Sequence, residues 1–160
     1  MGMLFDEFRI GDRWKTPGRT IAEADVAAFA GLSGDYNPVH TDETFAGDTA
    51  FGGRVAHGPM MIGIAFGLAS RLDLIDGTVI ALLSVNWSFH APVRAGDTIA
   101  ALIEVVEARE TRQADRGVLG LEFAVGNQRD ELVQTGASRL LMRRSRPSRA
   151  TWGRVSPEVS

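Results

Sequence analysis

The sequence predicts an α+β fold in which an antiparallel sheet curls around one long, buried central helix. Residues 59–72 are apolar on nearly every side, and a helix of this kind is normally buried. Strand-like segments rich in Val, Ile, Leu, Phe and Thr follow Gly77, at residues 78–90, 98–109, 117–125 and 131–141. The turns between them are short, and short connections favour antiparallel neighbours because parallel strands need long crossovers.

Size and composition indicate one globular domain. The chain has 160 residues, of which 44% are hydrophobic, so it can bury a sizeable core but would be cramped as two domains. We expect the domain to cover residues 1–142 and the Arg-rich segment 143–160 to form a flexible C-terminal tail. The net charge of -3 argues against a general role on nucleic acid or membrane surfaces. The chain has no cysteine, which excludes disulfides and thiol chemistry.

The first ten residues contain charged side chains. Asp6, Glu7 and Arg9 lie where a signal peptide would need an apolar core. The longest apolar run, residues 59–69, is too short to span a bilayer. These features predict a cytoplasmic protein with no membrane partner.

A helix is predicted to begin near residue 20. The run Thr-Ile-Ala-Glu at residues 20–23 has the form of a capping box. Apolar side chains then repeat at helical spacing, namely Ile21, Ala24, Ala28 and Leu32. We expect Gly31 and Gly34 to end this helix, and residues 12–19 to form a short strand before it.

The most informative stretch is Gly-Asp-Tyr-Asn-Pro-Val-His at residues 34–40. Asn37 is a strong N-cap type and Pro38 suits the first helical position, so a short helix should start at Pro38. Asp35 would then lie on a turn and His40 in the first helical turn, with both side chains aimed into one space. Asn37 would support the loop. A carboxylate and an imidazole placed together can move protons near neutral pH.

A second glycine-rich run covers residues 51–59. Gly58 followed by Pro59 is typical of a helix start. A backbone N–H at a helix N-terminus suits an oxygen that gains negative charge, and Pro59 has no N–H, so Gly58 is the expected donor. We interpret His57 as a hydrogen-bonded structural histidine. Gly63 and Gly67 lie four residues apart, and we expect them to allow close approach of a sheet or another helix.

These groups together predict addition of water to an acyl thioester, or its removal. A carboxylate cannot deprotonate water in advance, because the pKa of water is about 15.7. Asp35 would take a proton only as the C–O bond forms, and His40 would orient the water or shuttle the second proton. The thioester carbonyl would gain enolate-like charge, which the Gly58 N–H would stabilise.

Other readings of the same residues remain open. Asp35, His40, Asp42 and His57 could ligate a metal. No pair of them has a familiar helical spacing for ligands, so we expect no metal and no other cofactor. Asp42 and Glu43 would favour the first turns of the short helix through their negative charge.

The depth of a pocket for the acyl chain would depend on large side chains. Phe66, Trp87 and Phe89 are the candidates. Met60 and Met61 are expected in the core rather than in the pocket. His90 precedes a Pro-containing turn and is expected to be structural or to line the pocket.

Residues 34–42 closely resemble the hydratase motif of MaoC-like dehydratases, the group that contains R-specific enoyl-CoA hydratases. Residues 51–59 resemble the second signature of that family, and residues 89–98 resemble its strand–turn signature. The resemblance implies a hot-dog fold and a homodimer, or an oligomer of dimers, with pockets at the subunit interface. It also implies that Asp35 and His40 hold the water and that the Gly58 N–H binds the thioester carbonyl.

The sequence departs from the family pattern at two positions. The family often has Pro where Glu43 stands and Met or Leu where Pro59 stands, and neither change removes a catalytic group. The leading hypothesis is reversible hydration of a trans-2-enoyl-CoA, or the corresponding acyl-carrier-protein ester, to the 3-hydroxyacyl thioester. A thioesterase on the same fold is one alternative. A non-catalytic acyl-thioester-binding subunit is another, although a binding module needs neither Asp35 nor His40.

Overall fold

The structure is a computed structural model and describes residues 2–145. The predicted tail lies outside this range from residue 146 onward. The elements in chain order are η1 (Phe5–Glu7), β1 (Arg13–Lys15), β2 (Arg19–Thr20), α1 (Glu23–Ser33), α2 (Pro38–Thr41), α3 (Glu43–Gly47), α4 (Gly58–Ser70), β3 (Val79–Phe89), β4 (Thr98–Glu110), β5 (Arg116–Asn127) and β6 (Leu132–Arg143). None of the helices in the described range is long and apolar enough to cross a membrane.

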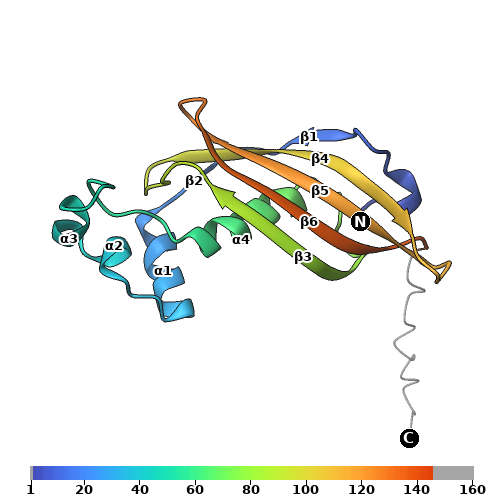
Figure 1. Cartoon of the computed structure of the whole chain (residues 1–160), viewed down its shortest axis with the longest axis horizontal. Helices are drawn as coiled ribbons and strands as arrows, with labels where there is room; N and C mark the ends of the chain where they lie inside the picture. Colours follow the sequence, from blue (N-terminus) through green and yellow to red (C-terminus); the bar gives the residue numbers. More distant parts are fainter. Residues whose placement is uncertain (1, 146–160) are drawn as a thin grey trace, which may run out of the picture.

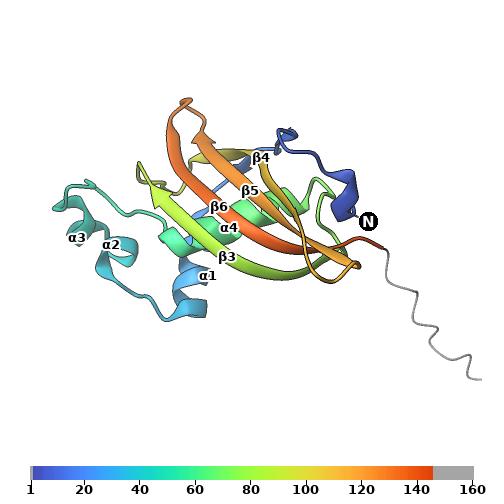
Figure 2. The ribbon, with the colours of Figure 1, turned by 45° about the vertical axis from the view of Figure 1, so that its right-hand side comes forward.

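One antiparallel sheet curves over α4, as Figures 1 and 2 show. Its strands run in the order β1-β4-β5-β6-β3, and β2 extends the β1 side by pairing with β4. The four long strands confirm the strand predictions, with ends that differ by no more than two residues. The predicted α+β architecture, a sheet wrapped around a central helix, is therefore confirmed.

The core lies between α4 and the concave face of the sheet. Met61 and Leu68 on α4 are each 1% exposed, and they belong to one cluster with buried sheet residues such as Ile103, Leu121 and Phe123. Burying a side chain of this size stabilises the fold by roughly 1.5–3 kcal/mol. The helix is apolar on nearly every side because most of its surface is covered in this way.

One side of α4 does not meet the sheet. Gly63 and Gly67 lie on that side, and a methyl group added at either would meet nothing within 4 Å. The predicted close packing at these glycines is therefore wrong for the described chain. The glycines lie four residues apart on a single exposed stripe, so they share a face that the sheet does not cover.

The predicted start of the first helix is also wrong. Thr20 belongs to β2, where its hydroxyl bonds that of Thr98, and α1 begins at Glu23. The Asp25 carboxylate accepts the N–H of Ala22 at 2.9 Å and so performs the capping that the sequence assigned to residues 20–23. Strand pairing across the sheet edge thus overrides the local capping pattern.

The buried face of α1 differs from the predicted one. Val26 and Ala30 are its buried residues, whereas Leu32 is 85% exposed. Ile21 is fully buried but precedes the helix. The predicted end holds, because Gly34 adopts a left-handed conformation with φ of 76° as the C-cap.

Candidate active site

The short helix α2 holds the Asp35–His40 loop in shape. The Asn37 side chain caps it by accepting the N–H of Val39 at 3.3 Å, and Pro38 begins the helix. The N–H of Asn37 in turn donates to Asp35 Oδ1 at 3.2 Å, so the carboxyl group is tied to its own turn. The predicted N-cap and helix start are confirmed, and both place His40 near the Asp35 carboxylate.

Asp35 and His40 face each other. Asp35 Oδ2 lies 4.0 Å from His40 Nε2, which is too long for a direct hydrogen bond and suits one bridging water. His40 Nδ1 lies 2.7 Å from the carbonyl oxygen of Val55. A carbonyl can only accept, so Nδ1 carries the proton and Nε2 is the ring nitrogen turned toward Asp35. The Asp35 side chain is 48% exposed and that of His40 13%.

His57 contacts both the backbone of Asp35 and the ring of His40. It is fully buried, and its Nε2–H donates to the backbone carbonyl of Asp35 at 2.9 Å. Its ring stacks on that of His40, with centroids 3.8 Å apart, and Phe29 packs against it at 5.0 Å. Nδ1 of His57 has no partner within residues 2–145. The expected hydrogen bond of His57 is therefore present, and its role in the site stays a prediction.

Gly58 begins α4 directly after His57. As the first helical residue it has no acceptor inside the helix, and none of the other residues in the described range accepts its N–H. A methyl group added at Gly58 would lie 3.0 Å from the ring of Phe89, so the site has no room for a larger side chain. The start of α4 thus presents a free N–H with the positive end of the helix dipole behind it.

A pocket of about 400 Å³ opens between α2, the start of α4 and the end of β3. Its lining includes His40 and Gly58, together with Phe89 and His90. The remaining lining is mostly apolar, namely Val39, Phe51, Val55, Ala56, Met61, Ala91, Pro92 and Val93, with Gln134. A largely apolar pocket with a few polar groups is the usual form of a small-molecule site.

The large aromatic residues predicted to set pocket depth are divided between pocket and core. Phe89 lines the pocket, whereas Phe66 is not among its lining residues. Phe66 instead packs against Trp87 and Phe123 beneath the sheet, with ring centroids 6.3 and 5.3 Å away. Met61 is both buried in the core and part of the pocket wall.

The geometry argues against a metal ion at this site. Asp35, His40 and His57 each offer one ligand atom within 4.8 Å of the others. The two imidazoles, however, stack with only 28° between their planes. Lone pairs in nearly parallel planes run side by side and do not converge on one ion. Asp42 lies outside this group because its carboxylate caps α3 by accepting the N–H of Phe45.

An ionic cluster that the sequence analysis missed holds the loop before α4. Arg54 bridges Glu43 and Glu23, and the hydrogen bond from Arg54 holds the pKa of the Glu43 carboxyl below its ordinary value. The Arg94 guanidinium donates to the carbonyl oxygens of Phe51 and Arg54. These contacts join positions far apart in the sequence, so no local motif could have revealed them.

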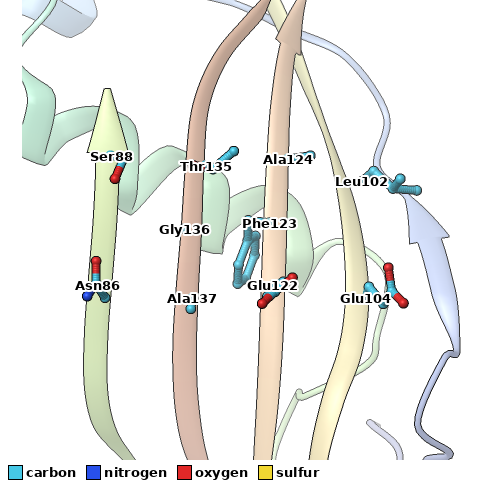
Figure 3. A pocket seen from close by; sticks show the side chains of 10 residues that line it. All are labelled: Asn86, Ser88, Leu102, Glu104, Glu122, Phe123, Ala124, Thr135, Gly136 and Ala137. Carbon is cyan, nitrogen blue, oxygen red and sulfur yellow. The ribbon is translucent and has the colours of Figure 1, made fainter. Parts of the chain in front are cut away.

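A second hollow of about 390 Å³ lies on the outer face of the sheet. Figure 3 shows its lining in two rows across the strands, with α4 behind them. Glu122 lies opposite Glu104 on the neighbouring strand, and small side chains such as Ala124 and Ala137 form the floor. No imidazole and no helix N-terminus lies among its lining residues, so its two carboxylates have neither a histidine partner nor a helix N–H donor for a developing oxyanion.

A family model and several named relatives match most of this chain. The model of the MaoC like domain matches residues 7–126. A 3-hydroxybutyryl-CoA dehydratase of Methylorubrum extorquens is 39% identical over 119 residues, which cover 74% of this chain and 71% of the relative. An (R)-specific enoyl-CoA hydratase of Aeromonas caviae is 36% identical over 113 residues, which cover 71% and 80% of the two chains.

Solved structures agree in fold. A MaoC-like dehydratase from Rhodospirillum rubrum superposes with a TM-score of 0.79 at 26% identity, covering 92% of this chain and 100% of that one. A Mycobacterium tuberculosis protein with a double hotdog fold gives a TM-score of 0.77 at 24% identity, covering 92% and 47%, and it supports the hot-dog fold alone. The predicted hot-dog fold is confirmed, and the chain belongs to the MaoC-like domain family.

Proposed function

We propose that this protein reversibly hydrates a trans-2-enoyl thioester, with coenzyme A as the carrier, to the 3-hydroxyacyl thioester. The observation that carries the proposal is the separation of 4.0 Å between the Asp35 carboxylate and Nε2 of His40. His40 lines the pocket together with Gly58, whereas Asp35 is not among the lining residues and reaches the pocket only through His40. The relatives named as a 3-hydroxybutyryl-CoA dehydratase and an (R)-specific enoyl-CoA hydratase support the same reaction class.

The mechanism follows from the fixed tautomer of His40. With Nδ1–H held on the Val55 carbonyl, Nε2 and the Asp35 carboxylate can bind one water between them. The water oxygen bonds to the β-carbon while one of its protons passes to Asp35. The electron pair of the double bond moves toward the thioester carbonyl. The proton taken up by Asp35 then passes through Nε2 of His40 to the α-carbon, so the new hydroxyl keeps the other proton of the water and both residues return to their starting states. Dehydration follows the same steps in reverse.

The thioester carbonyl would accept the Gly58 N–H. Charge develops on this oxygen only as the C–O bond forms, so a donor that is already aimed at it lowers the barrier. Gly58 has no side chain to block the approach, and the helix α4 behind it keeps the donor in place.

His57 acts as a positioning residue in this proposal. Its ring holds the Asp35 carbonyl and supports the face of His40, while its own backbone leads into Gly58. His57→Phe keeps an aromatic ring but removes the N–H. We expect this variant to lower kcat more than it raises KM, and an unchanged kcat in a folded variant would contradict the positioning role.

We also propose that the protein is a homodimer joined along β3. This strand is an edge of the sheet, is 11 residues long, and exposes apolar side chains, among them Leu82, Leu83 and Val85. An exposed edge of this kind is a template for pairing with another strand. Because Phe89 ends β3 and lines the pocket, the partner would lie close to the pocket. Light scattering coupled to gel filtration measures the mass directly.

The reaction is tested with crotonyl-CoA. Loss of the enoyl absorbance without release of free thiol supports hydration. Release of free thiol with loss of the thioester would instead support the thioesterase alternative. Binding without either change would favour the non-catalytic alternative.

A further inference from the structure

One polar side chain in the pocket has no role in the reaction proposed above. Gln134 lies on β6, directly opposite Phe89 of β3, and both residues line the pocket. It is only 2% exposed. A buried amide needs partners for both its oxygen and its nitrogen, because an unpaired buried polar group costs free energy.

The orientation of the Gln134 amide is fixed by chemistry. The indole Nε1–H of Trp87 donates to Gln134 Oε1 at 3.0 Å, and an indole N–H can only donate. Trp87 is itself held between Phe66 and Phe123, with ring centroids 6.3 and 5.4 Å away. The amide oxygen is therefore committed to Trp87, and the amide cannot flip without losing this bond.

The amide nitrogen of Gln134 is left without an acceptor. The one side-chain hydrogen bond of Gln134 within residues 2–145 is made by its oxygen, and the nitrogen is not fully buried, so it is accessible from the pocket. The side chains around it in the pocket wall are mainly apolar, Phe89 and Met61 among them. An all-alkyl acyl chain that filled this pocket would leave the NH₂ group unpaired, whereas an oxygen atom on the chain would accept its hydrogen bond.

We infer that Gln134 selects an acyl group that carries a neutral oxygen, a hydroxyl or keto group, on the chain beyond the reacting double bond. The inference rests on the proposed function, since it names the substrate class of the same pocket. A carboxylate is disfavoured because no Lys or Arg lies among the residues that line the pocket. A buried ionised carboxylate requires a paired charge.

The test compares matched esters. The probes are trans-2-hexenoyl-CoA and trans-2-octenoyl-CoA, each beside analogues of the same length with a hydroxyl or keto oxygen at carbon 5 or beyond. We expect at least one oxygenated ester to exceed its alkyl partner in kcat/KM by about tenfold or more, because a site built around a hydrogen-bond donor rejects analogues that cannot accept.

Two variants connect this preference to the amide nitrogen. Gln134→Leu removes both amide atoms and should abolish the preference while raising kcat/KM for the alkyl esters. Gln134→Glu keeps an oxygen for Trp87 but replaces the NH₂ donor by an acceptor, so it should also lose the preference. Thermal melting of both variants checks that they are folded.

Two outcomes would overturn the inference. One is a wild-type protein that favours alkyl esters at every length. The other is a preference for oxygenated esters that survives in folded Gln134→Leu and Gln134→Glu. If no ester is hydrated, the proposed function fails separately. Calorimetric affinities for the same esters then decide the role of Gln134, with equal affinities for both members of each pair counting against it.

Discussion

Two of the hollows in residues 2–145 have nearly equal volumes, but only one of these two combines acid–base groups with a helix N-terminus. The pocket at the start of α4 has a volume of about 400 Å³, and the hollow on the outer face of the sheet about 390 Å³. The pocket is lined by the imidazoles of His40 and His90 and by the helix N-terminus at Gly58. The outer hollow is lined by Glu104 and Glu122 among small side chains. Volume therefore does not identify the site.

The difference between the hollows reflects where the backbone ends its regular structure. In the outer hollow every lining residue lies on a strand, and no helix begins there. In the pocket α4 begins within the site, and the N–H of Gly58 has no acceptor among residues 2–145. The first N–H groups of α2 are already taken by Asn37. The following experiments challenge this contrast, from the largest expected effect to the smallest.

Asp35→Asn should lower the turnover of crotonyl-CoA by roughly 10²- to 10⁴-fold, the range for a lost acid–base group. Folding should be preserved because the Asp35 side chain is about half exposed. The matched control is Glu122→Gln, which makes the same chemical change in the outer hollow and should leave turnover unchanged. A folded Asp35→Asn variant with near-normal turnover would remove Asp35 from the mechanism.

His40→Ala should reduce turnover over a similar range. If Asp35 and His40 hold one water together, the double variant should be little worse than either single variant. Steady-state kinetics of the three variants measure this coupling. Strictly multiplicative losses would show that the two residues act separately.

Gly58→Ala should reduce kcat/KM by about 10²-fold, because its methyl group would push against the ring of Phe89 and displace the carbonyl-binding N–H. Gly63→Ala is the control in the same helix, where a methyl group meets nothing. It should leave turnover unchanged and raise stability by roughly 0.5–1 kcal/mol. Equal kinetic effects from both substitutions would contradict the special role of Gly58.

Asp97→Asn should change the stability of the fold but not the turnover, because Asp97 lines neither hollow. Burial raises the pKa of the Asp97 carboxyl, but hydrogen bonds from Arg129 and Gln128 outweigh this and hold it below its ordinary value. The folded protein thus binds the Asp97 proton less tightly than the unfolded chain does. The stabilisation is fully present above the unfolded pKa of about 3.9 and is lost as the pH falls through the folded pKa.

The variant should therefore be less stable than the wild type at pH 7, by about 1–3 kcal/mol, and the gap should close below about pH 4. Denaturant unfolding at pH 7 and below about pH 4 measures the difference in the free energy of unfolding. A gap that is independent of pH would mean that the charge of Asp97 does not contribute.

The smallest effect is expected at Glu122. It lies directly opposite Glu104, and like charges opposite one another are unfavourable. Arg13 already neutralises Glu104 at 2.9 Å. Glu122→Gln should therefore raise the melting temperature slightly at low salt and less at high salt. A clear loss of turnover in this variant would break the contrast between the two hollows.

Much of the local structure follows from short-range rules. Asn37 and Pro38 predict the start of α2, and Gly58 with Pro59 predicts that of α4, because caps and helix starts are decided by hydrogen bonds between near neighbours. The four long strands could be predicted because apolar runs and turn residues alternate clearly. The same rules failed for α1, where pairing of Thr20 with the sheet changed the start of the helix.

The approach of Asp35 to His40 could be expected from the local turn and helix start, but the contacts that support the pair could not. His57 reaches the Asp35 carbonyl across 22 positions of the chain, and Gln134 meets Trp87 across 47. Phe66 was a candidate for the pocket, but from α4 it packs against Trp87 and Phe123 of the sheet instead. None of these contacts has a local signal, since each depends on how distant elements pack.

By itself, therefore, the sequence determined the positions of the long strands, the starts of α2 and α4, and the identities of the carboxylate, the imidazole and the glycine. Only the tertiary structure decided which ring nitrogen of His40 faces Asp35, which histidine supports the pair, and which amide is left unpaired in the pocket. The physical reason is the distance along the chain over which each contact is made. Caps and turns are satisfied within a few residues, whereas the direction of a side chain in a pocket is set by whatever the folded chain brings beside it.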